Sequence, residues 1–192
     1  MFKVSSAFIG NFKIGDNIHY NLEVLKTLYA CREDLQPTQR RFLDKPITVT
    51  LVSICEALIY DLIDRSKFFT QEGVIGLSEA SLERLRKAKA WNLDKKLSLV
   101  KELDLLKAES ADVYVQLEDL AKLRNRIHIQ NEKKNFEADE AKAFTCSRRL
   151  KAEKMVELLV MRFGKLYPRP SHIVKSQYVD DFELPWKSHF QL

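Results

Sequence analysis

The sequence ITVTLVSICEALIYDLIDR, residues 47–65, is apolar on nearly every side of a helix. Pro46 stands directly before it, and proline is favoured in the first turn of a helix. The stretch contains several β-branched residues, but it is much longer than an ordinary strand. A helix that is apolar all round belongs in the middle of a bundle. These residues therefore predict a central, buried helix.

The composition of the whole chain also favours helices. Its 192 residues include only five glycines and five prolines, the residues that most often interrupt helices. A chain of this length can bury a sizeable core within one domain. We therefore expect an all-α fold, a single helical-bundle domain over residues 1–192, with its core at about 17–167, an N-terminal arm at 1–16 and a C-terminal extension at 168–192.

Apolar residues at helical spacing predict helices on both sides of the central one. Serine and asparagine mark several expected starts because their side chains accept hydrogen bonds from the first free N–H groups of a helix. A helix also tends to end before a proline, as at Pro37. The expected helices begin near Asn17, after Pro46, near Ser78 or Ser81, near Asn92 or Asp94, near Ala111 and near Ala138, and the last two end near Ile129 and Leu166.

The two ends of the chain lack a clear helical period. In the N-terminal arm, apolar residues alternate around Gly10 and Gly15, a pattern that suits a short hairpin or an irregular arm on the bundle. The C-terminal extension carries Trp186 and Phe190 without periodicity. It is either an arm packed on the bundle or a partner-binding extension.

The apolar segments do not predict a membrane protein. Polar residues, among them Glu56 and Asp61, interrupt the longest apolar stretch, which falls short of the roughly 20 apolar residues of a membrane span. The N-terminal residues lack the unbroken apolar core of a signal peptide. We therefore expect a cytoplasmic protein that does not contact membranes.

Cysteine, histidine and charge patterns suggest neither a metal site nor a cofactor. Cys31, Cys55 and Cys146 are far apart and form no CxxC pair, which is typical of reduced thiols. The net charge of +5 admits a polyanionic partner without demanding one. Basic runs such as residues 148–154 contain acidic residues as well, so they are predicted to be solvated helix faces.

One arginine breaks the apolar pattern of residues 119–131, DLAKLRNRIHIQN. Arg124 falls on the stripe formed by Leu117, Leu120 and Ile127, where an apolar side chain is expected. A buried arginine requires an acidic partner. At about 100° per residue, one strip of the central helix offers such partners. The strip contains Ser53, Glu56, Tyr60 and Asp64, with Asp61 at its edge.

The same segment contains the groups needed to cut RNA without a metal. Arg124 and His128 are four residues apart, so a helix would make them neighbours, with Asn125 beside them. An imidazole can take the proton from a 2′-hydroxyl or deliver one to the leaving 5′ oxygen. A guanidinium can hold the phosphate and stabilise its developing charge.

The motif LRNRIH, residues 123–128, resembles the signature of HEPN domains, an arginine followed by a polar residue and then by a histidine. The segment SICEALIYDLI, residues 53–63, resembles the acidic and apolar helix that packs against the motif helix in many of these proteins. The resemblance implies an all-α bundle that forms a homodimer in which two motifs line one cleft. It also implies a metal-independent ribonuclease of toxin–antitoxin, abortive-infection or RNA-guided defence systems.

The resemblance assigns a role to each site residue. His128 would be the general acid or base, Arg124 would bind phosphate, and Asn125 would orient them. Glu56 or Asp61 would support Arg124. RNA would be the substrate, an antitoxin or regulatory protein a further partner, and no cofactor would be needed.

The spacing of the motif leaves two other interpretations open. Three residues separate Arg124 from His128, one fewer than is usual in the family, and one residue rotates a helical position by about 100°. The chain is then alternatively a catalytically inactive HEPN-like module that binds RNA or a protein. In a third interpretation the chain is a structural helical protein. Arg124 then serves only as the partner of an acid, and His128 stands near a helix C-terminus only because the helix dipole favours it there.

Overall fold

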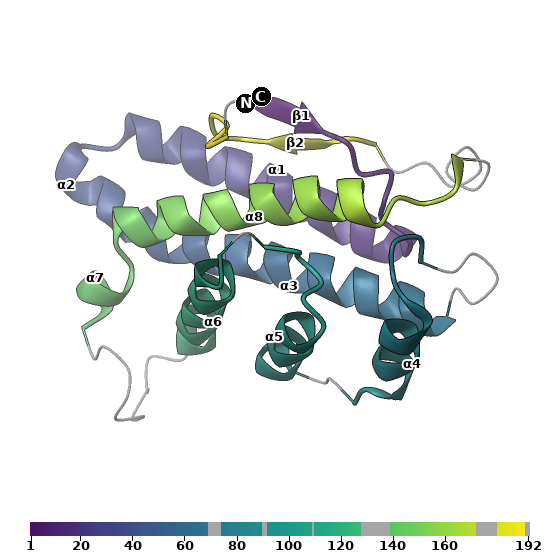
Figure 1. The fold of residues 1–192 in the computed structure, drawn as a ribbon. Coiled ribbons are helices and arrows are strands. Elements are labelled where there is room, and N and C mark those ends of the chain that lie inside the picture. Colours follow the sequence, from purple (N-terminus) through teal and green to yellow (C-terminus); the bar gives the residue numbers. More distant parts are fainter. Residues whose placement is uncertain (69–73, 90–91, 109, 128–138, 172–179, 191–192) are drawn as a thin grey trace.

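A computed structural model describes residues 1–68, 74–89, 92–108, 110–127, 139–171 and 180–190. Helices dominate these residues, so the expected all-α class is confirmed (Figure 1). The α-helices are α1 (Phe12–Asp34), α2 (Pro37–Arg40), α3 (Asp44–Phe68), α4 (Glu79–Lys87), α5 (Leu93–Glu102), α6 (Asp112–Arg124), α7 (Glu140–Ala143) and α8 (Cys146–Leu166). The 3₁₀ helices are η1 (Arg41–Leu43) and η2 (Asn125–Ile127), and the strands are β1 (Phe2–Val4) and β2 (Phe182–Leu184).

Helix α3 is the centre of the bundle, as its sequence predicts. It contacts α1 and α8, which run along the length of the molecule beside it, and the shorter α4, α5 and α6, which pack against it from below in Figure 1. Leu51, Leu58 and Ile59 of α3 are completely buried. The segment Pro37–Phe68 is long and apolar enough to span a membrane, but most of its apolar window is buried inside the fold, as in a core helix.

The expected N-terminal hairpin is wrong, because β1 pairs with the other end of the chain. Phe2 lies opposite Leu184 and Val4 opposite Phe182 in an antiparallel ribbon. The ribbon lies over α1 in Figure 1 and brings the two termini together. Phe182 and Leu184 are buried in the core. A pairing between such distant residues has no local signature, whereas a hairpin is encoded by its turn.

Helix α1 begins five residues earlier than expected, at Phe12 instead of Asn17. The Asn11 side chain accepts hydrogen bonds from the N–H groups of Lys13 and Ile14, at 3.0 and 3.4 Å. This cap stabilises the first turn and offsets the weak helix preference of Gly15. The arm that precedes the bundle therefore ends at Asn11.

Two long predicted helices are shorter in the structure. The helix expected over 138–166 is divided into α7 and α8, because Thr145 caps a new helix through a hydrogen bond from the Arg148 N–H at 3.4 Å. The helix expected over 111–129 ends as α6 at Arg124 and continues as η2. By contrast, Ser78 and Asn92 cap α4 and α5 as predicted.

The described part of the C-terminal extension is an arm packed on the bundle. Trp186 is buried, and its ring centroid lies 6.3 Å from that of Tyr29 on α1. Ser188 and the backbone N–H of His189 donate hydrogen bonds to the completely buried Glu157 of α8. For residues 180–190 the first of the two alternatives for this segment is therefore correct.

Candidate functional site

The predicted pairing of Arg124 with an acid of the central helix is present. Arg124 is the last residue of α6, which packs on α3, and its Nη2 lies 3.2 Å from Oε2 of Glu56. The Glu56 side chain is 18% exposed and that of Arg124 37%. The carboxylate thus fixes the guanidinium at a place where solvent still reaches it.

Glu56 also binds a second cation that the sequence reasoning missed. Lys96 of α5 places its Nζ 2.9 Å from Oε1 of Glu56 and 5.0 Å from the ring centroid of Tyr60. Its side chain is 8% exposed. We call Glu56, Lys96 and Arg124 the Glu56 cluster, in which two cations share one carboxylate. One positive charge is therefore in excess, and it attracts anions.

Lys96 could have been found by the signal that singles out Arg124. Lys96 follows Leu93 by three residues and precedes Val100 by four, so it occupies a position on the apolar stripe of its helix. Both Leu93 and Val100 are buried. A charged residue in such a position predicts a buried ion pair.

One donor of Arg124 has no acceptor within the described residues. Its Nε atom is buried and makes no hydrogen bond there. Buried donors in native proteins are almost always paired with protein, water or ligand. Because this N–H is closed to solvent, an anion bound at Arg124 would contact the exposed part of the side chain instead.

The backbone changes at the motif itself. Helix α6 ends at Arg124, and Asn125 is exposed and begins the 3₁₀ turn η2. Arg126 has φ −85° and ψ 21°, outside the helical range. We predicted that a regular α-helix makes Arg124 and His128 neighbours. For residues 125–127 this prediction is wrong, because they form a 3₁₀ turn. His128 lies outside the described residues, and its place beside Arg124 stays a prediction.

Arg126 connects the motif to α7. It is only 3% exposed, and its Nη2 lies 3.8 Å from Oε1 of Glu140. The other carboxylate oxygen of Glu140 accepts from Nζ of Lys45, near the start of α3. The turn after Arg124 is thereby tied to α7 and to the start of α3.

Asp61 is not part of the Glu56 cluster. Its Oδ1 accepts from the N–H groups of Gly10 and Asn11, at 3.0 and 2.9 Å, and its Oδ2 accepts from Gly10 at 3.1 Å. Asp61 follows Glu56 by five positions, which places the two side chains about 140° apart around a helix. Asp61 thus faces the N-terminal arm and holds it on α3, away from Arg124.

Burial raises the pKa of Asp61 to about 6, although the two backbone N–H donors and Arg65 lower it. Because the pKa in the fold exceeds the unfolded value, the contribution of Asp61 to stability is complete below about pH 4 and is lost as the pH rises through 6. We expect the free energy of unfolding of wild type, relative to Asp61→Asn, to fall by about 3 kcal/mol over this window.

Urea unfolding at several pH values measures this difference. Asp119→Asn is the control, since the Asp119 side chain is 66% exposed and should show little relative change. A difference between wild type and Asp61→Asn that stays constant from pH 4 to 7 would contradict the prediction.

A second cluster of buried charges joins α1, α3 and α8. Nε of Arg149 lies 2.9 Å from Oδ1 of Asp44, and its Nη1 contacts Glu153. Glu153 also accepts from the Tyr29 hydroxyl and lies 2.9 Å from Nε2 of His189. Burial and the Glu153 carboxylate raise the pKa of Tyr29. We call these five residues the Arg149 network.

The expectation that residues 148–154 are a solvated face is wrong for Arg149. Arg149 is 6% exposed, whereas Lys151 and Lys154 are exposed. Arg149 and Glu153 stand three residues before Ala152 and Val156, which are completely buried, and thus lie on the buried side of α8. None of the five residues of the Arg149 network lies on α6, which carries Arg124. We therefore interpret the network as structural.

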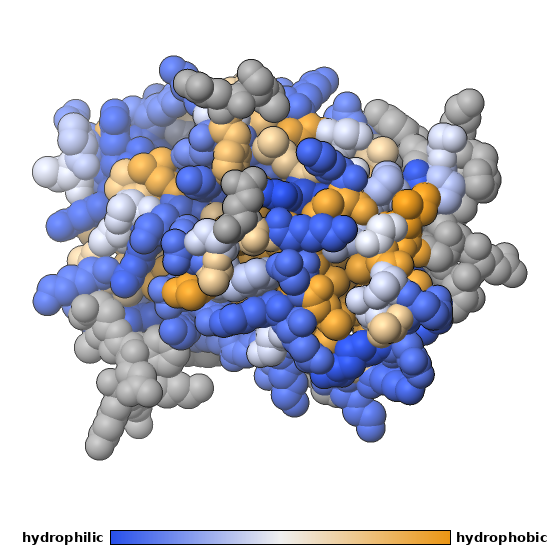
Figure 2. All heavy atoms as spheres, in the orientation of Figure 1, coloured by the Kyte–Doolittle hydropathy of each residue, from blue (hydrophilic) through white to orange (hydrophobic). Residues whose placement is uncertain are grey.

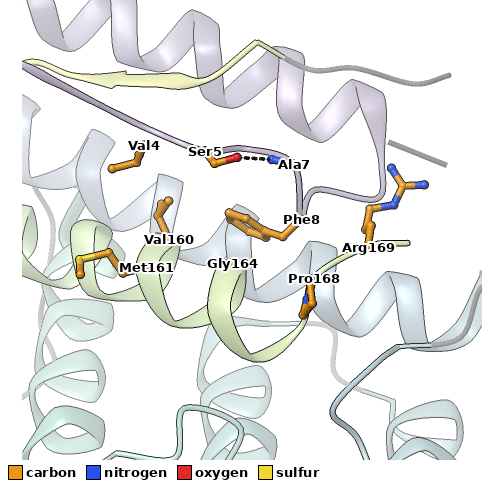
Figure 3. Close-up of a pocket in the computed structure, with 9 residues that line it drawn as sticks. All are labelled: Val4, Ser5, Ala7, Phe8, Val160, Met161, Gly164, Pro168 and Arg169. Atoms are coloured by element: carbon orange, nitrogen blue, oxygen red, sulfur yellow. Dashed lines mark hydrogen bonds between the residues drawn. The ribbon is translucent and has the colours of Figure 1, made fainter. Parts of the chain in front are cut away.

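An apolar cavity of about 310 Å³ lies between the C-terminal half of α8 and the N-terminal arm (Figure 3). Phe8 of the N-terminal arm points across it toward Gly164 of α8, and Arg169 stands at one end. The cavity contains no residue of α6 or of the Glu56 cluster. On the face shown in Figure 2, hydrophilic side chains predominate and apolar side chains appear as patches between them.

The described residues contain no group of three or more His, Cys, Asp or Glu side chains that could hold a metal ion. Charged groups that lie near the motif include the Glu56 cluster and Arg126 with its partner Glu140. Comparisons of the chain with protein-family models, with curated proteins and with solved structures find no match.

Proposed function

We propose that the chain is a HEPN-type, metal-independent endoribonuclease whose site is centred on Arg124, Asn125 and His128. It acts in the cytoplasm as a homodimer in which two motifs share one cleft. A role in a toxin–antitoxin or antiviral defence system follows from the same resemblance, with an antitoxin or regulatory protein as the partner that restrains it.

The observation that carries the proposal is that the Arg124 side chain is both paired and accessible to solvent. Glu56 fixes its guanidinium at 3.2 Å, yet over a third of the side chain remains exposed. Because solvent reaches the guanidinium, a ligand can reach it as well, which complete burial with its partner would prevent. A fixed and accessible guanidinium is suited to bind a phosphate without losing much side-chain entropy.

Cleavage of one phosphodiester requires removal of a proton from the 2′-hydroxyl, donation of a proton to the 5′ oxygen, and stabilisation of the charge on the phosphate. The 2′ oxygen attacks phosphorus, the bond to the 5′ oxygen breaks, and the products are a cyclic phosphate and a 5′-hydroxyl. His128 takes the proton from the 2′-hydroxyl or gives one to the 5′ oxygen, and the second motif of the dimer supplies the other transfer. Arg124 stabilises the charge that develops on the phosphate oxygens.

A second candidate function is RNA or protein binding without cleavage. The end of α6 at Arg124 and the 3₁₀ turn after it favour this alternative. They change the direction of the chain between Arg124 and His128 from that of a regular helix. In that case RNA binds at Arg124 and is not cut.

Arg124→Ala tests the proposal directly. We expect the cleavage rate of a labelled RNA pool in EDTA to fall by about 10²–10³-fold, because a stabilising cation is removed from the transition state. Lys122→Ala on the same helix is the matched control, since its side chain is 56% exposed and pairs only with Asp119 in the described residues. Equal activity of Arg124→Ala and wild type would remove the assignment.

The stability of Arg124→Ala separates this proposal from a structural role. The pair with Glu56 is partly solvated and Lys96 keeps the carboxylate paired, so we expect a loss of about 1 kcal/mol or less in the free energy of unfolding. A loss of about 3–5 kcal/mol, the cost of breaking a buried pair, would support the structural interpretation instead. Urea unfolding followed by circular dichroism measures it.

A further inference from the structure

A cavity of about 240 Å³ opens between α7 and the start of α3. Two aromatic rings contribute to it, Phe42 from η1 and Phe144 from the residue after α7. The lining is completed by Arg41, Ala141 and the paired side chains of Lys45 and Glu140. We call it the Phe42 cavity.

Phe42 has little role in the core. It is 66% exposed, although a phenylalanine of a folded domain is usually buried. The guanidinium carbon of Arg41 lies 5.1 Å from its ring centroid. An exposed ring beside an arginine is the combination on which unpaired nucleic-acid bases stack.

Phe144 and the charges give the cavity its inner wall. Phe144 is 4% exposed, and Nζ of Lys45 lies 5.5 Å from its ring centroid. Nζ of Lys45 is paired with Glu140, so Arg41 is the cation of this lining that remains in excess. The excess positive charge beside two aromatic rings favours a ligand with planar bases and phosphates over an acidic or purely apolar one.

The Phe42 cavity is connected to the proposed site. Glu140, which lines it, lies 3.8 Å from Arg126, and Arg126 is two residues from Arg124. The pair of Arg126 and Glu140 thus joins the turn after Arg124 to the wall of the Phe42 cavity. Bases in a duplex are already stacked, so only a single strand can place one on Phe42.

We propose that the Phe42 cavity is a base-binding subsite for single-stranded RNA, with Phe42 as the stacking platform and Arg41 as the phosphate contact. The inference rests on the proposed function, because it takes RNA as the ligand. It goes further in naming single-stranded RNA as the substrate class and Phe42 as a residue that selects it.

The test is the affinity for a fluorescent single-stranded RNA of about 12 nucleotides, measured by anisotropy in the full chain carrying His128→Ala to prevent cleavage. We expect Phe42→Ala to raise Kd roughly 10- to 100-fold, as loss of a stacked base does. Phe42→Tyr should keep nearly the parent affinity because it keeps an aromatic face. The same RNA in a duplex should bind more weakly than the single strand.

Phe12→Ala is the matched control, since Phe12 on α1 is 65% exposed and lies outside the Phe42 cavity. The proposal is overturned if Phe42→Ala binds as tightly as the parent, if Phe12→Ala weakens binding equally, or if single-stranded RNA does not bind. Cleavage by chains with and without His128→Ala is assayed separately. RNA that binds through Phe42 but is not cut would refute the ribonuclease and leave the subsite standing.

Discussion

Replacing Arg149 by methionine is expected to lower the free energy of unfolding by about 3–5 kcal/mol. Arg149 is the cation between Asp44 and Glu153, which are both 2% exposed. Methionine keeps most of the buried volume but removes the charge. The carboxylates of Asp44 and Glu153 then lose the cation between them. A buried charge without its partner is among the most destabilising changes in a fold.

The remaining contacts explain why the loss has an upper bound. Asp44 still lies 3.5 Å from Nε of Arg32, and Glu153 still accepts from Tyr29 and contacts His189. These groups lie on α1, α8 and the C-terminal arm, so Arg149→Met should loosen the docking of that arm as well as the bundle.

Lys151→Met on the same helix is the control for Arg149→Met. Lys151 is exposed, so the same loss of one positive charge should change stability by about 0.5 kcal/mol or less. Urea unfolding of the three proteins at neutral pH gives the comparison. If Arg149→Met were no less stable than Lys151→Met, the Arg149 network would not be a source of stability.

The central part of the fold could be predicted from the sequence because its signals are local. The apolar stretch at 47–65 has the length and composition of a buried helix, and α3 is the centre of the bundle. Ser78 and Asn92 are caps whose side chains act on the next turn. The β1–β2 pairing escaped prediction because its partners are at opposite ends of the chain.

In the candidate site, the sequence identifies the residues at which a charged side chain interrupts the apolar stripe of a helix. Arg124 was found in this way, and helical geometry gave a strip of the central helix that contains its partner Glu56 among other acids. Asp61 stands at the edge of the same strip, but the N-terminal arm provides two backbone donors that hold it elsewhere. Sequence spacing gives the side of a helix, whereas the element that packs there depends on the tertiary fold.

His128→Ala is expected to reduce RNA cleavage by about 10²–10⁴-fold while leaving the helical circular-dichroism signal unchanged. Within LRNRIH, residues 123–128, the imidazole is the group that titrates near neutral pH. Its loss removes proton transfer but not phosphate binding at Arg124. RNA affinity should therefore change much less than the cleavage rate, and that separation identifies a catalytic group.

The proposed function is tested most directly by incubating wild type and His128→Ala with a mixed pool of labelled RNAs in EDTA and resolving the products on a gel. EDTA inhibits contaminating metal-dependent nucleases by binding their metal ions. Any cleavage by His128→Ala would reveal a contaminating nuclease that passed through the same purification. The account predicts that wild type cuts the RNA and that His128→Ala does not. Intact RNA with correctly folded wild type, or equal cleavage by both proteins, would contradict it.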